Sequence, residues 1–328
     1  MKKILSFLVV LFVSFPLWAS DNVSILISDG IDNETIKNKM EQTMSRLFTE
    51  ANVAHETNRN FNYTGLGLSD EVKTSIGMLW ENSPFVCLDN KVVEHCLTTG
   101  TGYQIRNIPL ELVNADEDDK YHEAVIGFDK RGNMTSFHLA ISWNLYKDVI
   151  SANLEVTDLR RKQLVVDWVE QFRTAYNEKN IRFLDAVFSE DALIITGTVI
   201  PQRSKEGIRL PDKIKYNKQT KTQYLTNLRK VFARNKHIRV TFDEIEVEQH
   251  PTVDGVYGVT LHQGYSSDSY HDDGYLFLLW DFRKEDKPTI HVRTWQPDKY
   301  NDGKKIVKIS EDDKIGMGDF GDLELIDE

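Results

Sequence analysis

The sequence predicts an α+β protein with two domains, in each of which helices pack on one face of a curved antiparallel sheet. The 328 residues are enough for two domains of ordinary size. In each half, segments with apolar residues at helical spacing come first, and strand-like segments separated by turn residues follow. With 40% hydrophobic and 10% aromatic residues, the composition excludes a disordered chain.

The N-terminal α+β domain is assigned to residues 21–150. A short apolar strand is expected at 23–27, and a helix begins at 32–34 because apolar residues recur every three or four positions up to Ala51. A second helix is expected at 69–80, with Ser69 or Asp70 as its N-cap. The strands that follow are predicted at 85–88, 92–98, 103–113, 121–129 and 134–142.

The C-terminal domain is assigned to residues 157–300, and an acidic tail to 311–328. Helices are predicted at 159–177, 181–188 and 220–233, with a basic, polar loop before the third helix. Strands are predicted at 192–198, 238–249, 256–265, 275–283 and 290–296. Because the two halves share this order of elements, the N-terminal domain is either a diverged copy of the C-terminal domain or an independent α+β fold.

The segments 165–177, 181–188 and 189–195 carry a resemblance to the NTF2-like superfamily, which includes SnoaL-like and ketosteroid-isomerase-like proteins. The resemblance covers about residues 159–297 and implies a cone, in which a bent antiparallel sheet surrounds a long helix and leaves a pocket at its open end. The whole chain, including 277–282 and 290–297, is also similar to exported proteins of Bacteroides-type bacteria.

The resemblance also implies where an isomerase of this superfamily would carry its catalytic groups. A tyrosine, an aspartate base and a late acid would fall at Phe172, Thr196 and Leu279. None of these side chains can supply the required chemistry. The sequence therefore favours a non-catalytic protein that binds a small ligand or an envelope protein through the pocket. The alternative is a hydrolase, dehydratase or isomerase that uses Asp281, His291 and Tyr176.

The last predicted strand supplies the best candidates for ligand binding. His291, Arg293 and Trp295 alternate along it, so strand geometry places them on one face. With Tyr275 and His262 from neighbouring strands they would form an aromatic, cationic pocket suited to an anionic or planar ligand. If these side chains face outward instead, Asp281 is expected to pair with Arg293 across the strands.

The first nineteen residues have the pattern of a signal peptide, with Lys2 and Lys3 before an apolar run. Export to the periplasm or cell envelope is therefore expected, without a later transmembrane span; the alternative is an N-terminal membrane anchor. Cys87 and Cys96 flank a predicted hairpin, so they either form a disulfide in an oxidising compartment or stay reduced.

The net charge of −11 argues against nucleic acid as a partner. The basic segment 213–239 is either a solvated surface or a docking site for an acidic surface, such as the tail or a second copy in a homodimer. No cofactor is predicted. No metal site is predicted either, because His262 and His271 lack ligand spacing and two cysteines are too few for a Cys-built centre.

Overall fold

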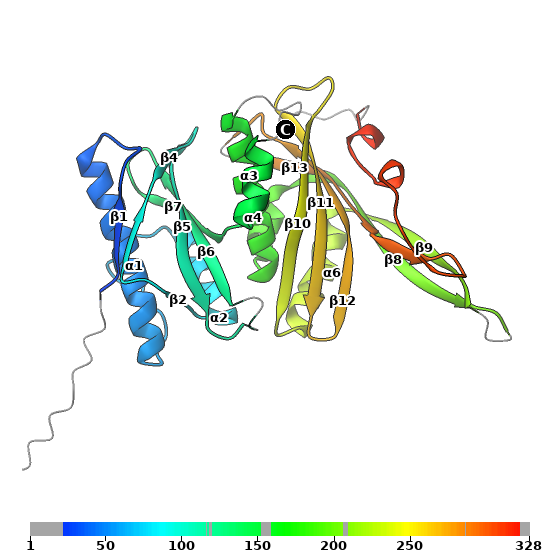
Figure 1. Cartoon of the computed structure of the whole chain (residues 1–328), viewed down its shortest axis with the longest axis horizontal. Coiled ribbons are helices and arrows are strands. Elements are labelled where there is room, and N and C mark those ends of the chain that lie inside the picture. The colour runs from blue at the N-terminus through cyan, green and yellow to red at the C-terminus, as the bar shows by residue number, and fades with distance from the viewer. Residues whose placement is uncertain are drawn as a thin grey trace, which may run out of the picture.

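A computed structural model describes residues 22–115, 117, 120–151, 159–205, 209–285 and 287–321. The predicted signal peptide, residues 1–19, lies outside the described residues. The described chain forms two halves, each with its own sheet and hydrophobic core. The long helix α4 (Leu159–Asn177) lies between them (Figure 1). The predicted α+β class is confirmed. Among the described residues, no helix combines the length and the apolar character that crossing a membrane requires.

The N-terminal half contains a five-stranded antiparallel sheet and a small parallel pair. The sheet has the order β2-β5-β6-β7, with β4 also pairing with β5, and the parallel pair is β1 with β3. Its elements are β1 (Ser24–Ile27), α1 (Glu34–Glu56), α2 (Asp70–Asn82), β2 (Phe85–Cys87), β3 (Lys91–Glu94), β4 (Cys96–Thr98), β5 (Gly102–Leu112), β6 (Tyr121–Asp129) and β7 (Met134–Leu139). Helix α3 (Trp143–Ser151) follows β7 in the chain but packs on α4 and β10, and its buried Tyr146 and Val149 belong to the core of the C-terminal half.

Both predicted helices of this half form. Ser69 caps α2 as expected, since its side chain accepts a hydrogen bond from the backbone N–H of Val72. The predicted strand 92–98 is instead two strands, because the chain leaves β1 after Glu94 and joins β5 at Cys96.

The cysteines are free, so the disulfide alternative is wrong for this structure. Cys87 lies opposite Leu110 and Cys96 opposite Ile105, at two different places along the same edge of β5. Their partners on β5 are five residues apart, so at ~3.3 Å per residue the two cysteines are on the order of 16 Å apart, well beyond the reach of a disulfide. Burial raises the pKa of both thiols to about 11, which keeps them protonated.

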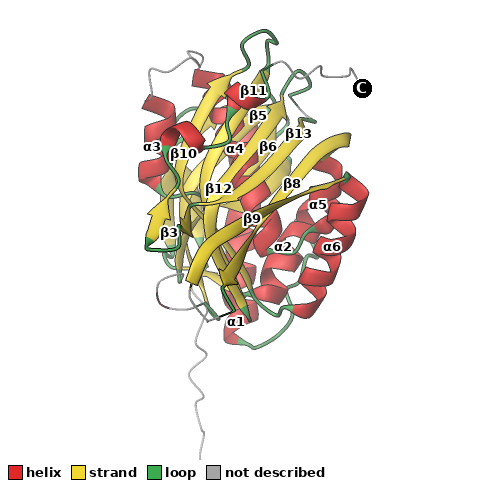
Figure 2. Cartoon of the chain, turned by 90° about the vertical axis from the view of Figure 1, so that its right-hand side faces the viewer, coloured by secondary structure: helices red, strands yellow, loops and turns green. Residues whose placement is uncertain are grey.

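The C-terminal half wraps a six-stranded sheet around α4, in the order β10-β11-β12-β13-β8-β9. Its remaining elements are α5 (Ile181–Val187), β8 (Phe188–Arg203), β9 (Arg209–Gln219), α6 (Lys221–Arg234), β10 (Ile238–Gln249), β11 (Val256–Ser267), β12 (Tyr270–Asp281), β13 (Thr289–Pro297), β14 (Lys299–Asn301) and β15 (Ile306–Lys308). Helices α5 and α6 lie side by side next to β8 (Figure 2).

Alternation along β12 separates an inner from an outer face of this sheet. Leu276, Leu278 and Trp280 belong to the main core with α4, whereas Phe277 and Leu279 belong to a second cluster on the opposite face. This is the cone that the NTF2-like resemblance implies, and that prediction of the fold is confirmed.

The segment 209–219, predicted as a basic loop, is strand β9. Its lysines occupy an edge strand that pairs only with β8, so both of its faces are largely open to solvent and no apolar alternation is needed. The basic residues from Lys213 onward therefore divide between this strand and the surface of α6.

The acidic C-terminal segment docks on the outer face of the cone. It does so through two 3-10 turns, η2 (Glu311–Asp313) and η3 (Met317–Asp319). Phe320 stacks on Phe277 with ring centroids 5.4 Å apart. The end of the predicted tail, 322–328, lies outside the described residues.

Candidate functional site in the C-terminal cone

The open end of the cone holds a cavity of about 460 Å³. Residues from helices α4 and α6 and from the four strands β8, β11, β12 and β13 line it, which is the arrangement that positions a ligand on a rigid frame. Its most distinctive lining residues are Tyr176 on α4, Tyr224 on α6, Gln263 on β11, Asp272 on β12, and Arg293 and Trp295 on β13.

Arg293 is the centre of this site. Its side chain is 7% exposed, and its guanidinium lies over the ring of Tyr224 at 5.0 Å from the centroid. Within the described part of the chain, its Nε and Nη1 atoms have no hydrogen-bond partner. A buried cation is costly unless it is paired, so a guanidinium with free donors in a cavity is prepared for an anion.

Two tyrosines add hydroxyl groups beside this cation. The hydroxyls of Tyr176 and Tyr224 are hydrogen-bonded to each other, and Arg293 donates to Tyr176. Burial, followed by the neighbouring Tyr224, raises the pKa of Tyr176 well above its ordinary value. Tyr176 is therefore a neutral donor and acceptor at every physiological pH.

Trp295 provides a flat apolar wall that depends on two glycines. A Cβ atom on Gly274 would lie 2.7 Å from the indole ring, and one on Gly197 would lie 3.1 Å from it. The absence of side chains at both positions lets the ring lie against the neighbouring strands. The cavity therefore combines a fixed cation, paired hydroxyls and an aromatic surface.

The structure places Arg293 and Trp295 in this cavity, but His291 is not with them. The register of β13 against both neighbouring strands shifts between Ile290 and Val292, so a bulge at His291 interrupts the alternation. Ile290 accordingly packs in the inner core and Val292 in the outer cluster. The prediction of three residues on one face is wrong for His291.

The predicted catalytic set is divided between two places. Tyr176 lines the cavity, whereas Asp281 lies on the outer face, opposite Val256 of the outer cluster. His291 Nε2 is 3.4 Å from Asp281 Oδ2, and Arg283, not Arg293, binds the carboxylate at 2.7 Å. Burial opposes ionisation of Asp281, but His291 and Arg283 outweigh it and hold its pKa below the usual range. These three residues therefore cannot act together.

Tyr275 and His262 are also on the outer face. Their rings are 5.1 Å apart, and they are register partners on β12 and β11. His262 contacts Asp243 at 2.5 Å, and Lys314 from the C-terminal segment lies 4.1 Å from the ring of Tyr275. Odd-numbered positions of β12 near Phe277 face outward, so Tyr275 does too, and His262 lies beside it on β11. Neither Tyr275 nor His262 is therefore part of the cone pocket.

Sequence reasoning missed two of the cavity's polar residues. Tyr224 is on α6, where the apolar spacing of Tyr224, Leu225, Leu228 and Phe232 could have indicated a buried face behind the basic residues. Asp272 stood in a segment predicted as a turn, but β12 begins at Tyr270 and carries it into the sheet. Ser267, Ser269 and Tyr270, where β11 ends and β12 begins, also line the cavity.

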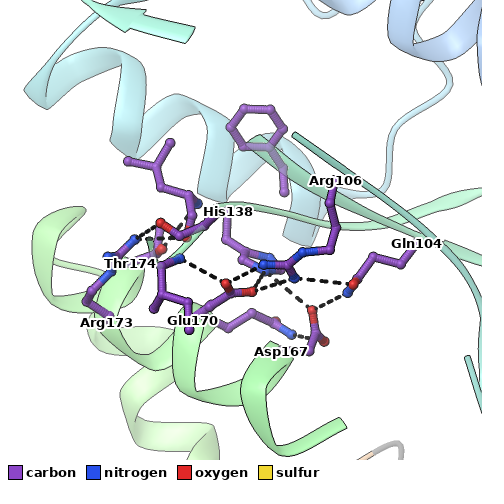
Figure 3. Close-up of polar contacts among 12 residues, drawn as sticks. Gln104, Arg106, His138, Asp167, Glu170, Arg173 and Thr174 are labelled. Carbon is purple, nitrogen blue, oxygen red and sulfur yellow. Dashed lines mark hydrogen bonds and ion pairs between the residues drawn. The ribbon is translucent and has the colours of Figure 1, made fainter. Parts of the chain in front are cut away.

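A second polar cluster joins the two halves (Figure 3). Arg106 on β5 binds both oxygens of Glu170 on α4, at 2.9 and 2.6 Å, and Glu170 is 0% exposed. His138 on β7 lies 3.3 Å from Asp167 and 3.4 Å from Glu170, and Gln104 donates to Asp167 at 2.7 Å. The cluster therefore links α4 to the sheet of the N-terminal half.

The same residues include a set that resembles a metal site. His138, Asp167 and Glu170 bring ligand atoms within 4.8 Å of one another. However, Arg106 already occupies both oxygens of Glu170 with a guanidinium charge. Burial opposes ionisation of Glu170, but Arg106 and His138 lower its pKa to about 2. We therefore interpret the cluster as an ion-pair network that holds the halves together.

A buried carboxyl group nearby, that of Glu178, leads to a prediction about how stability depends on pH. Glu178 is 2% exposed, and burial raises its pKa well above the ordinary 4.5 despite hydrogen bonds from Ser75. Such a group stabilises the fold below pH 4.5, and this contribution is lost as pH rises toward the folded-state pKa. We expect E178Q to raise the melting temperature at pH 8 by roughly 2–4 °C and to flatten its pH dependence above pH 4.5.

Scanning calorimetry between pH 4 and 9 checks this prediction. The matched control is E50Q, because Arg59 and a backbone N–H lower the pKa of Glu50 despite its partial burial. That substitution is expected to reduce stability at neutral pH. If E178Q and E50Q shift the melting temperature in the same direction, the account of Glu178 is wrong.

Comparison with known proteins finds similar solved structures at low identity. No family model matches the sequence, and no curated protein is similar to it. Similar solved structures include an NTF2-like protein from Cytophaga hutchinsonii, with 10% identity and a TM-score of 0.32 over 42% of this chain and 97% of that chain. ActVI-ORFA from Streptomyces coelicolor has 14% identity and a TM-score of 0.30, over 42% of this chain and 96% of that chain. Bd1075 from Bdellovibrio bacteriovorus has 13% identity and a TM-score of 0.33, over 61% of this chain and 78% of that chain.

At these identities the likeness concerns the fold alone. The class that the topology and the cavity define is an α+β protein whose C-terminal half is a curved sheet wrapped around a long helix. Its own chemistry has to be derived from the side chains in the cavity.

Proposed function

We propose that the protein is a non-catalytic binding protein, and that its cone takes a small planar ligand with an anionic group. The observation that carries this proposal is the buried guanidinium of Arg293, with two nitrogen atoms free of partners among the described residues. A carboxylate or a similar oxyanion would accept a hydrogen bond from one of these donors and offset the buried charge.

The remaining lining residues support the planar part of this ligand. Trp295 offers a flat ring, and the hydroxyl pair of Tyr176 and Tyr224 offers a neutral polar contact beside the cation. A cavity of about 460 Å³ is large enough for a ligand of one or two rings. The signal-like pattern of residues 1–19 supports the proposal that this binding takes place in the periplasm or cell envelope.

The test uses two ligands that differ in charge but hardly in shape. 4-Biphenylcarboxylate and 4-biphenylcarboxamide are titrated into the protein and followed by isothermal calorimetry. We expect the carboxylate to bind roughly tenfold more tightly or better, because a charge-assisted hydrogen bond contributes about 1.5–3 kcal/mol. Equal affinities, or no binding of either compound, would contradict the proposal.

A second candidate function is a proton-transfer enzyme that acts in the same cavity. Oδ1 of Asp272 is buried without a hydrogen-bond partner among the described residues, and Tyr270 donates to its Oδ2 at 2.8 Å. Burial raises the pKa of Asp272, which makes it a stronger base than an ordinary carboxylate. It could take a proton from a carbon next to a carbonyl group, while Tyr176 and Arg293 bind the resulting enolate oxygen.

The probe for this candidate is 4-acetylbenzoate, whose methyl ketone protons can exchange with D₂O. Proton NMR measures the exchange rate with the native protein and with D272N. Accelerated exchange that D272N abolishes would favour the enzyme. Binding of the probe without acceleration would favour the non-catalytic function.

A further inference from the structure

We propose that the cleft between the two halves is a second binding site, and that its ligand is a neutral saccharide chain. Two adjoining cavities, of about 310 and 300 Å³, lie along this cleft. Both are lined by Thr135, Ser136 and Gln171, so they form one continuous groove. None of the residues that line the groove lines the cone pocket.

The groove has one wall from each half of the chain. Helix α2 and strand β7 provide the N-terminal wall, and α4 and α5 provide the C-terminal wall. Helix α4 runs between the two sheets along this cleft (Figure 1). Because the ion-pair network of Arg106 and Glu170 fixes the two walls, the groove is preformed.

The polar groups of the groove suit a ligand with many hydroxyls and no charge. Hydroxyl and amide side chains can each donate and accept, which is what sugar hydroxyls require. The members of this group are Ser75, Thr135, Ser136, Thr174, Gln104, Gln163, Gln171 and Asn180. The arginines at the two rims are already paired, Arg182 with Glu71 at 3.4 Å and Arg160 with Glu285. The groove therefore offers no free cation to a charged ligand.

Two buried groups in the first cavity point to a polar ligand rather than an apolar one. His138 is 1% exposed, and its Nδ1 has no hydrogen-bond partner in the part of the chain that the structure describes. Glu178 also lines this cavity, and burial raises its pKa well above the ordinary value, which favours the protonated form that can donate as well as accept. A buried polar atom without a partner costs free energy, and a ligand hydroxyl would remove that cost.

Aromatic rings lie where a sugar ring could pack. Trp168 lines one cavity and Phe183 the other, and their rings stack with centroids 5.9 Å apart and an interplanar angle of 24°. Both side chains are only partly buried by the rest of the protein. Flat apolar surfaces flanked by hydroxyl and amide groups match the apolar faces and polar edges of a pyranose ring.

The test measures binding of neutral trisaccharides to the full chain. Maltotriose, cellotriose and chitotriose are titrated by isothermal calorimetry, with trialanine as a peptide probe. We expect at least one trisaccharide to bind more tightly than trialanine. We expect S136W, which fills the groove from its wall, to weaken that binding at least tenfold. The control T35W, at an exposed position in the first turn of α1, is expected to leave the affinity unchanged.

The outcomes separate this site from the cone. T135W, at the exposed neighbouring position, is a second blocking variant if S136W does not fold. R293M is expected to leave saccharide binding unchanged, and S136W to leave 4-biphenylcarboxylate binding unchanged. The proposal is overturned if no trisaccharide binds, if trialanine binds more tightly than all of them, or if both blocking variants bind like the native protein.

Discussion

Replacing Arg106 with methionine is expected to lower the free energy of unfolding by about 3–5 kcal/mol, the range for breaking one side of a buried ion pair. Glu170 is fully buried and receives two hydrogen bonds from Arg106, at 2.6 and 2.9 Å. Without the guanidinium, a carboxylate remains in the contact between the halves, and its partners among the described residues are His138 and the backbone N–H of Ile141. Guanidinium denaturation at pH 7 measures this loss.

A double variant shows whether the unpaired charge causes the loss. R106M/E170Q removes both charges and is expected to recover a large part of the stability, because neutral groups of similar size replace buried pairs at little cost. The control is R59M, which breaks an Arg–Glu pair with side chains 38% and 14% exposed. That change should cost under about 1 kcal/mol. A double variant no more stable than R106M would contradict this interpretation.

The Arg106–Glu170 pair also leads to a prediction about how the stability of the native protein changes at low pH. The pKa of Glu170 lies at about 2, below its ordinary 4.5. Its contribution to stability is therefore present above pH 4.5 and is lost as pH falls toward 2. The part of the acid sensitivity that belongs to Glu170 is expected to be absent in R106M/E170Q.

The sequence predicted most of the elements that build the cone. The apolar spacing of Val165, Val169 and Phe172 places α4 correctly, because burial of one helix face determines that pattern. Alternation along 275–281 likewise identifies both faces of β12. These patterns are local, so one sequence is sufficient to find them.

The missed features depend on contacts between distant residues. Strand β9 is polar on both faces, since it is an edge strand with little to cover, and its sequence looks like a loop. The bulge at His291 moves one side chain to the other face and leaves no compositional sign. Arg106 and Glu170 are 64 residues apart, and each looks like an ordinary surface charge until the fold buries them together.

The sequence predicted only those residues of the cone site that follow from a pattern within a single helix or strand. Arg293 and Trp295 follow from alternation along one strand, and Tyr176 follows from the period of α4. Tyr224 and Asp272 come from elements that fold over the cavity from elsewhere in the chain, so strand periodicity cannot associate them with Arg293. That the N-terminal domain is a diverged copy of the C-terminal domain remains a prediction, since the N-terminal sheet has five strands and the C-terminal sheet has six.

Replacing Arg293 with methionine is expected to stabilise the protein and to remove its ligand binding. The guanidinium is buried with two nitrogen atoms unpaired among the described residues. Substituting an apolar side chain of similar length removes its desolvation cost. A gain of about 1–3 kcal/mol in the free energy of unfolding is consistent with replacements of buried charges. A residue that weakens the fold and faces a cavity is retained for what it binds.

The affinity of R293M for an anionic ligand should fall, although its stability rises. Removing one partner of a buried charge pair costs about 2–5 kcal/mol, so R293M is expected to weaken 4-biphenylcarboxylate binding by at least ~30-fold. The carboxamide, which makes no ion pair, should lose much less. Denaturation and calorimetry in one buffer at pH 7 measure both effects on the same preparation.

The control is R283M, which removes an exposed arginine from the outer face of the cone. Arg283 binds Asp281 on the outer face at 2.7 Å and is not among the residues that line the cavity, so its loss leaves a carboxylate without its main partner. R283M is therefore expected to lose stability and to keep its affinity for the carboxylate. If R293M loses stability as R283M does, or binds the carboxylate as tightly as the native protein, then Arg293 is a structural residue and the anion site is not in the cone.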